Sequence, residues 1–173
     1  MKTRLVPRLG EWRAARLHAR LTLHALRTAR AAACGPVELY DTARQRGADL
    51  GERMHHALAR GLRRHRGVII IGADCPALRP GQLRRAARWL AGGCDVVIAP
   101  AEDGGYTLIG AKRVSPLLFS GIAWGGPDVY ESTMRKLVSL NYRWRALERL
   151  WDVDRPADLG RLDWVRFALR VRR

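Results

Sequence analysis

One carboxylate in the sequence follows directly on a strongly apolar stretch. In "VIIIGADCPAL", residues 68–78, four β-branched residues are followed by Gly72 and then by Asp74. Asp74 therefore comes just past the end of a predicted strand, which is where open α/β sheets bind their ligands. A carboxylate at this point could hold Mg²⁺ or Mn²⁺ on a diphosphate, because hard cations prefer oxygen ligands. The same side chain could instead cap the turn or helix that follows.

A second candidate is "AEDGGYTLIG", residues 101–110. Asp103, Gly104 and Gly105 are a turn signal, since glycine adopts backbone angles that other residues avoid. The simpler interpretation is a hairpin turn between two strands. The functional interpretation is that the glycines allow backbone N–H groups and the Tyr106 side chain to reach a substrate. The sequence is compatible with both.

The third candidate is "WDVDRPADL", residues 151–159, in which Asp152 and Asp154 are two positions apart. If this segment is extended, both side chains point to the same face. They could then share one metal ion with Asp74, because divalent cations take several carboxylate oxygens. The alternative is a cluster of helix caps, with Asp158 at the start of the final helix.

The hydrophobic pattern predicts alternating helices and strands. Apolar residues three or four apart indicate a helix, whereas an unalternating run such as residues 67–71 is typical of a strand covered on both faces. Helices are expected near 10–33, 48–65, 80–93, 125–140 and 156–170, and strands at 36–40, 67–71, 94–100, 106–111 and within 145–154. This order predicts an α/β fold with a mostly parallel sheet, and we expect one domain over residues 1–173.

Composition narrows the function classes further. The chain has 173 residues, 47% of them hydrophobic, and a net charge of +16 that comes mainly from arginine. Because the arginines are spread over every predicted helix, we interpret them as solvated faces rather than as a nucleic-acid-binding surface. Lys2 and Arg4 in "KTRL" could pair with phosphates. No stretch approaches the roughly 18–20 apolar residues of a membrane span, and three scattered cysteines favour a reducing cytoplasm.

Six stretches taken together resemble a known protein family. "KTRL", "GADLGERM", "IIIGADCPAL", "DVVIAPAEDGGYTLIG", "IAW" and "DVDRPADL" occur in the same order as in the DUF2064 proteins. These are glycosyltransferase-A-like proteins, also called radical-SAM/selenodomain-associated transferases, and some are assigned to arsenosugar biosynthesis. The resemblance extends over nearly the whole chain. It implies a nucleotide-diphospho-sugar transferase fold, a three-layer GT-A-like sandwich.

The resemblance also implies roles for individual residues. Asp74 matches the metal-binding aspartate of the family, and Asp74 and Asp103 are the implied catalytic residues. Asp152 and Asp154 match a stretch in which a second metal ligand is expected. The residues implied at the sugar or acceptor are Gly104, Gly105, Tyr106 and Trp124, and those implied at the phosphates are Lys2 and Arg4.

Two departures from the family concern the N-terminal half. Family members carry a hydrophobic strand and a Gly/Pro-containing loop before "KTRL", whereas this sequence starts inside that motif. The interval between "PVELY" and "QRGADLGERM" is also short. We therefore expect the first strand of the sheet, and a further helix and strand, to be absent.

The expected function is that of a glycosyltransferase-like enzyme that depends on Mg²⁺ or Mn²⁺. It would take a nucleotide-sugar donor and a small-molecule acceptor, and the metal ion would neutralise the diphosphate leaving group. Two alternatives remain open. One is a nucleotidyltransferase that uses an NTP and releases pyrophosphate, and the other is a truncated, inactive remnant that binds anions.

Overall fold

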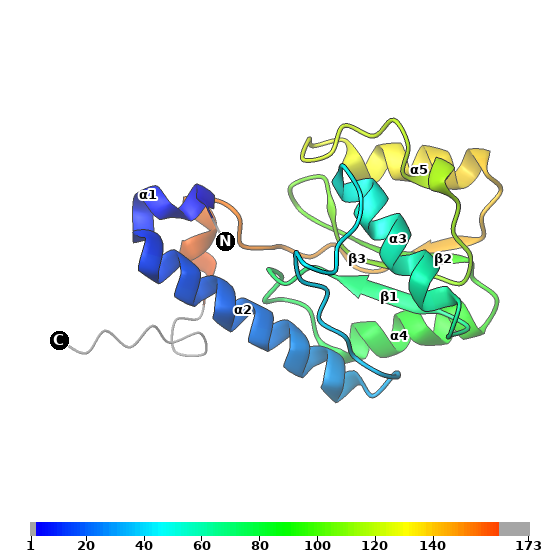
Figure 1. The fold of residues 1–173 in the computed structure, drawn as a ribbon, viewed down its shortest axis with the longest axis horizontal. Coiled ribbons are helices and arrows are strands. Elements are labelled where there is room, and N and C mark those ends of the chain that lie inside the picture. Colours follow the sequence, from blue (N-terminus) through cyan, green and yellow to red (C-terminus); the bar gives the residue numbers. More distant parts are fainter. Residues whose placement is uncertain (1–2, 163–173) are drawn as a thin grey trace.

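Helices and strands alternate along the chain much as the hydrophobic pattern predicts (Figure 1). The computed structural model describes residues 3–162. Its α-helices are α1 (Val6–Leu9), α2 (Glu11–Ala32), α3 (Leu50–Leu62), α4 (Pro80–Ala91) and α5 (Val129–Ser139). Its strands are β1 (Val68–Ile71), β2 (Val96–Pro100), β3 (Tyr106–Ala111) and β4 (Trp144–Ala146). The described 3-10 helices are η1 (Thr3–Leu5), η2 (Pro116–Leu118) and η3 (Pro156–Arg161).

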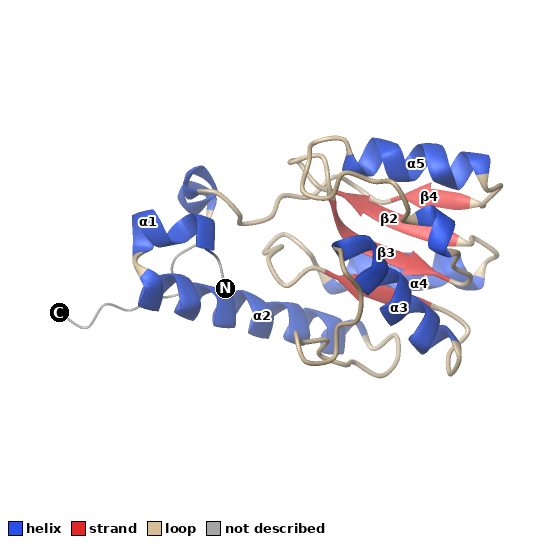
Figure 2. Cartoon of the chain, turned by 45° about the horizontal axis from the view of Figure 1, so that its top comes forward, coloured by secondary structure: helices blue, strands red, loops and turns tan. Residues whose placement is uncertain are grey.

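The four described strands form one sheet in the order β1-β3-β2-β4. β2 and β4 are parallel, while β3 is antiparallel to both of its neighbours. Three strands therefore point the same way, as expected for a mostly parallel sheet, and β3 runs in the opposite direction because a tight hairpin joins it to β2. Helix α4 packs on one face of the sheet, and α3 and α5 pack on the other (Figure 2). The α/β prediction is confirmed.

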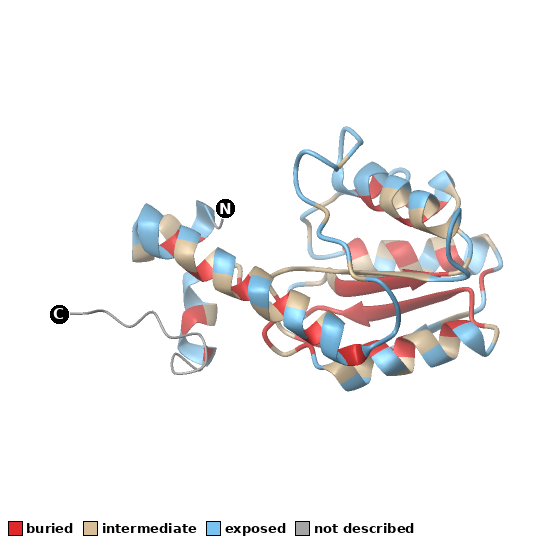
Figure 3. Ribbon diagram, turned by 60° about the horizontal axis from the view of Figure 1, so that its bottom comes forward, coloured by how far each residue is buried: buried red, intermediate tan, exposed pale blue. Residues whose placement is uncertain are grey.

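Strand β2 shows why the sheet has two apolar faces. Val97 and Ala99 point into one core with α4, and Val96 and Ile98 point into the other with α3 and α5, as the two-residue period of a strand requires. All five residues of β2 are buried (Figure 3). Burying each large aliphatic side chain stabilises the fold by about 1.5–3 kcal/mol. The central sheet therefore offers a well-packed support to residues at its end.

Strand β1 differs from the prediction that residues 67–71 form a fully buried strand. Its four residues are only half-buried, although α3 packs on one face and α4 on the other. The reason is its position, since β1 lies at the edge of the described sheet and pairs only with β3. Gly61 in α3 allows the close approach, because an added Cβ would lie 2.6 Å from a methyl carbon of Val68.

A third apolar cluster lies to one side of the sheet, at the left of Figure 1. It joins the first two helices to the segment that follows β4, so that the N-terminal and C-terminal parts of the described chain meet. Its buried members are Leu5, Ala14, Leu17, Leu21, Val153, Leu159 and Leu162. Helix α2 leads from this cluster to the main body, where Ala32 packs near α4. No described helix combines the length and the apolar character needed to cross a membrane.

Two predicted elements are wrong or shifted. Residues 36–40 form a mostly exposed loop instead of a strand, because no strand within residues 3–162 pairs with their backbone. The last strand begins at Trp144, one residue before the predicted stretch, and only an isolated bridge between Ala101 and Leu150 continues it. The start of the predicted final helix is the 3-10 helix η3, and its part beyond Leu162 lies outside the described residues.

Candidate functional site

Asp74 lies in the loop that leaves the end of β1, as the sequence predicts. The loop is fixed to the neighbouring strand because the backbone N–H of Gly72 donates to the carbonyl of Thr107 (2.9 Å). The Asp74 carboxylate folds back over Gly72, and an added Cβ at Gly72 would lie 2.7 Å from Oδ1 of Asp74. A side chain at position 72 would therefore displace the Asp74 carboxylate from this position.

The Asp74 loop is tied to the segment that carries Asp152 and Asp154. The backbone N–H of Val153 donates to the carbonyl oxygen of Asp74 (2.9 Å). The Cys75 thiol donates to the carbonyl oxygen of Trp151 (3.3 Å). Two motifs almost 80 residues apart in sequence are thus adjacent in space.

Asp152 and Asp154 line the same hollow, as an extended segment predicts. Val153 between them is fully buried in the third apolar cluster, so the flanking carboxylates lie on the other side. The segment is held from its C-terminal end as well, because Oδ2 of Asp158 accepts hydrogen bonds from the backbone N–H groups of Asp154 (2.9 Å) and Arg155 (2.6 Å). Asp158 is therefore a cap, in agreement with its expected position at a helix start.

The hollow has a volume of about 370 Å³ and a mixed, mainly acidic lining. It brings Asp103 together with Asp152 and Asp154, and it also contains charged residues that the sequence did not single out. The lining residues are Glu102, Asp103, Pro127, Trp151, Asp152, Asp154, Arg155, Asp158 and Arg161. Asp74 is not among them, although its loop is hydrogen-bonded to the segment that forms one wall.

Asp103 occupies a hairpin turn, which is the simpler of the two interpretations. Oδ1 of Asp103 accepts a hydrogen bond from the backbone N–H of Gly105 (2.9 Å), and Ala101 closes the turn by donating to the Gly105 carbonyl (2.9 Å). The tip of the hairpin contacts α5, because the N–H of Tyr130 donates to the carbonyl of Gly104 (2.8 Å). Gly104 has φ +90°, and an added Cβ would lie only 1.7 Å from the carbonyl oxygen of Pro127.

Tyr106 and Trp124 lie in the apolar core next to the hairpin. Their rings meet edge to face with centroids 6.5 Å apart, and the Trp124 ring covers Gly51 of α3, where an added Cβ would lie 2.5 Å from a ring carbon. Neither the Tyr106 hydroxyl nor the Trp124 indole N–H makes a hydrogen bond of normal geometry within residues 3–162. Burial raises the pKa of Tyr106, an effect that nearby Thr133 offsets only partly. A direct contact of these rings with a sugar stays a prediction.

Of the two implied phosphate-binding residues, Lys2 and Arg4, the structure describes only Arg4. Lys2 lies outside the described residues. Arg4 forms an ion pair with Asp154, so it adds positive charge at the edge of the hollow. Sequence reasoning missed two further arginines there, Arg155 and Arg161. The position of Arg155 directly after the "WDVD" stretch was an available signal, whereas nothing in the local sequence marks Arg161.

Arg161 links the two walls of the hollow. Its guanidinium donates to both carboxylate oxygens of Glu102 (2.5 and 3.0 Å) and stacks over the ring of Trp151, 4.5 Å from the ring centre. The hydrogen bond from Arg161 lowers the pKa of the exposed Glu102 carboxyl, so that this group is ionised at neutral pH. The hairpin that carries Asp103 is thereby joined to the 3-10 helix η3.

The described carboxylates do not make a complete metal site by themselves. Within residues 3–162 there is no group of three or more His, Cys, Asp or Glu side chains that could hold a metal ion. Mg²⁺, however, usually keeps several waters and binds through one or two carboxylates together with substrate phosphates. Oxygen donors from Asp74 and its neighbours fit that chemistry, with the remaining ligands supplied by a diphosphate and water.

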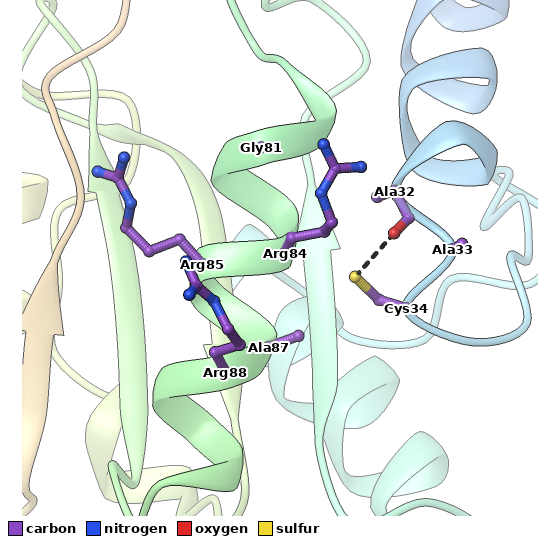
Figure 4. A pocket seen from close by; sticks show the side chains of 8 residues that line it. All are labelled: Ala32, Ala33, Cys34, Gly81, Arg84, Arg85, Ala87 and Arg88. Atoms are coloured by element: carbon purple, nitrogen blue, oxygen red, sulfur yellow. Dashed lines mark hydrogen bonds between the residues drawn. The ribbon is translucent and has the colours of Figure 1, made fainter.

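A larger hollow of about 640 Å³ lies between the end of α2 and α4 (Figure 4). It contains none of the predicted site residues. Two of its arginines are engaged within the protein, because Arg84 donates to the carbonyl of Ala31 (3.2 Å) and Arg85 pairs with Glu148. The smaller acidic hollow is therefore the better candidate for chemistry.

Comparisons with known proteins agree with this geometry. Residues 12–126 match the family described as "Uncharacterized protein conserved in bacteria (DUF2064)". A crystal structure from Desulfovibrio desulfuricans G20, described as a "putative nucleotide-diphospho-sugar transferase", superposes with a TM-score of 0.77 and 29% sequence identity. The match covers 90% of this chain and 76% of that one, and it confirms the GT-A-like fold. No curated protein sequence matches the chain.

Proposed function

Because the chain belongs to the DUF2064 family, we propose that it transfers a sugar from a nucleotide-sugar donor to a small-molecule acceptor with the help of a divalent metal ion. The description of the Desulfovibrio protein, which has the same fold, supports a nucleotide-sugar donor. The observation that carries the proposal is the hydrogen bond from Val153 N–H to the carbonyl of Asp74. It joins the carboxylate at the end of a strand to a second carboxylate segment, where open α/β sheets bind ligands.

Charge is the argument for metal dependence. The chain carries 16 acidic residues, and five of them, Glu102, Asp103, Asp152, Asp154 and Asp158, line one hollow in a protein of net charge +16. A nucleoside diphosphate is itself an anion, so it would be repelled by these carboxylates unless a cation lay between them. Mg²⁺ or Mn²⁺ held by Asp74 with Asp152 or Asp154 would supply that cation. Bound there, the metal ion would neutralise the charge of the diphosphate leaving group.

The protein's own residues would then have separate tasks. Arg155 lies in the hollow and would contact the outer phosphate oxygens, since guanidinium groups bind phosphate through paired N–H donors. Arg161 would keep its bonds to Glu102 and hold the hairpin in place. Asp103 in the rigid hairpin would orient a hydroxyl of the sugar or of the acceptor. Tyr106 and Trp124 would support the hairpin and α3 from the core.

The test is nucleotide binding measured as thermal stabilisation. UDP and GDP should raise the melting temperature when Mg²⁺ or Mn²⁺ is present and leave it unchanged in EDTA. At a ligand concentration of about 100 times Kd, binding stabilises the native state by about 2.7 kcal/mol, which is roughly 5–10 °C for a chain of this size. Equal stabilisation by any polyanion without metal would mean that only the net charge of the chain is at work.

Two variants test the assignment of Asp74. Asp74→Asn keeps the shape of the side chain but removes its charge, so we expect it to abolish metal-dependent stabilisation while changing the free energy of unfolding by less than about 1 kcal/mol. Asp158→Asn is the matched control, because Asp158 lines the same hollow but is used for capping. It should keep metal-dependent binding. Release of pyrophosphate from an NTP by the unmodified protein would favour the nucleotidyltransferase instead.

A further inference from the structure

Cys75 is the residue next to Asp74, and its thiol lies at the contact between the two carboxylate segments. The residue is 3% exposed and belongs to the apolar core that α4 covers. Its Sγ–H donates to the carbonyl oxygen of Trp151 (3.3 Å). Beside it, the N–H of Val153, two residues after Trp151, donates to the carbonyl of Asp74, the residue before Cys75 (2.9 Å). Both bonds therefore connect the Asp74–Cys75 backbone to residues 151–153.

The surroundings of the sulfur keep it in the neutral, donating form. Burial raises the pKa of the Cys75 thiol to about 11, and nearby backbone N–H groups of Leu78 and Ala77 and the Thr107 hydroxyl offset only part of that effect. The contact itself identifies the donor, because a carbonyl oxygen 3.3 Å from Sγ can only accept, so the sulfur carries the proton. A nucleophilic role does not fit, since the reactive form of cysteine is the thiolate.

Cysteine suits both surroundings of this side chain, the apolar core and the Trp151 carbonyl. A thiol has the apolar volume that the surrounding core requires and also a weak hydrogen-bond donor. Leu78 and Leu108 pack in the same core, and the Trp151 carbonyl approaches from the site. Alanine would lose the donor and leave a small cavity, whereas serine would keep a donor in nearly the same place.

We infer that Cys75 is a positioning residue, whose thiol holds the Trp151–Asp154 segment against the Asp74 loop and so fixes the separation of the carboxylates. The inference builds on the proposed function, because it assigns the purpose of that fixed separation to metal and diphosphate binding. Without the thiol, the Val153–Asp74 hydrogen bond would have to hold the two backbones together at this point without its neighbour. The segment would then separate from the loop more often, while the rest of the sheet stayed folded.

Amide hydrogen exchange of Val153 measures this separation directly. We expect Cys75→Ala to speed exchange of the Val153 amide by about 3- to 10-fold, the range that corresponds to one lost hydrogen bond. Amides of Val97 and Ile98 in the central strand β2 should keep their exchange rates. Cys75→Ser should restore the Val153 rate to nearly that of the unmodified protein.

Cys94→Ala is the matched control. Cys94 is also buried in the same core, and its thiol donates to the carbonyls of Val96 (3.2 Å) and Arg143 (3.4 Å), but it does not contact the site. It should leave Val153 exchange unchanged. Equal acceleration in the Cys94 and Cys75 variants, or no acceleration in Cys75→Ala, would overturn the inference. A serine variant that behaves like alanine would show that only packing volume matters, which also overturns it.

Binding of UDP with Mn²⁺ provides the link to function. The Kd measured by calorimetry should rise in Cys75→Ala by about the same factor as the exchange rate and recover in Cys75→Ser. If the unmodified protein binds no UDP with Mn²⁺, the proposed function fails, and the Val153 exchange still decides whether the thiol holds the two segments together. An unchanged Kd in Cys75→Ala, beside accelerated exchange, would overturn the positioning role.

Discussion

Replacing Gly104 by alanine tests whether the two-glycine turn serves the fold or a ligand. The backbone at Gly104 has φ +90°, which costs a residue with a Cβ about 1–2 kcal/mol. The added Cβ would also lie 1.7 Å from the carbonyl oxygen of Pro127, a backbone atom that cannot rotate away. The hairpin must therefore move from α5, and the hydrogen bond from Tyr130 N–H to Gly104 is weakened or lost, at a cost of about 1–3 kcal/mol.

The expected loss for Gly104→Ala is roughly 2–5 kcal/mol, a large part of a total stability of about 5–15 kcal/mol. Gly121→Ala is the first control, because Gly121 also has a positive φ (+65°) but no atom within 4 Å of the added Cβ. It should cost only about 1–2 kcal/mol. Gly81→Ala, in α4 and equally unobstructed, should instead stabilise the protein by about 0.5–1 kcal/mol.

Urea denaturation followed by circular dichroism would measure all three variants. If Gly104→Ala is no less stable than Gly121→Ala, the clash with Pro127 is not real, and the hairpin does not depend on α5 for its position. The glycine would then be free to serve a ligand, which is the interpretation that the described contacts do not require. If the ranking holds, α5 fixes the hairpin that carries Asp103.

Three further predictions concern the cap, a thiol and the sheet edge. Asp158→Ala should lower the free energy of unfolding by about 0.5–2 kcal/mol, because the backbone N–H groups of Asp154 and Arg155 lose their acceptor, and urea denaturation would detect it. For Cys75, the pKa is raised from 9.0 to about 11 in the folded state. The unfolded thiol therefore ionises first as pH rises, so roughly 3 kcal/mol of stability that is fully present below pH 9 should be lost by about pH 11. Cys75→Ser should lack this loss in pH-dependent unfolding, and an identical pH profile in both proteins would contradict the assignment. Finally, the apolar edge strand β1 carries no charge or proline, so sedimentation velocity should show association in roughly the micromolar to millimolar range, and a monomer throughout would mean that the edge is covered.

Secondary structure and burial could be predicted from the sequence where the local hydrophobic pattern matches the environment of the element in the fold. Strand β2 is apolar on both faces and is buried on both, and Pro80 starts a helix as its fixed φ allows. Strand β1 has the same apolar pattern but lies at an edge, because exposure depends on which strands lie beside it. Residues 36–40 have strand propensity, but no strand of the described chain pairs with them, so they form a loop.

The candidate site residues also divide into those whose position follows from local sequence and those whose position depends on distant contacts. The positions of Asp74, Asp152 and Asp154 could be predicted, because strand ends and two-residue spacing are local properties. The direction of Tyr106 could not, since a tyrosine at the start of a strand can face the hollow or the core with equal local cost. Only its packing against Trp124 decides between them. The role of Arg161 in joining the walls of the hollow could not be predicted either, because its partner Glu102 is 59 positions away in sequence.

The site is supported from two directions. Asp74 is carried by the central sheet, whereas Asp154 is carried by the third apolar cluster, through Val153, and by its ion pair with Arg4. The Val153–Asp74 and Cys75–Trp151 hydrogen bonds join these supports next to the carboxylates, and the Arg161–Glu102 pair joins them at the hairpin. Each of the first two bonds is worth about 1 kcal/mol, which is much less than the stability of either support. The geometry of the carboxylates is therefore set by these local bonds, so that substitutions there can alter ligand affinity while the fold remains intact.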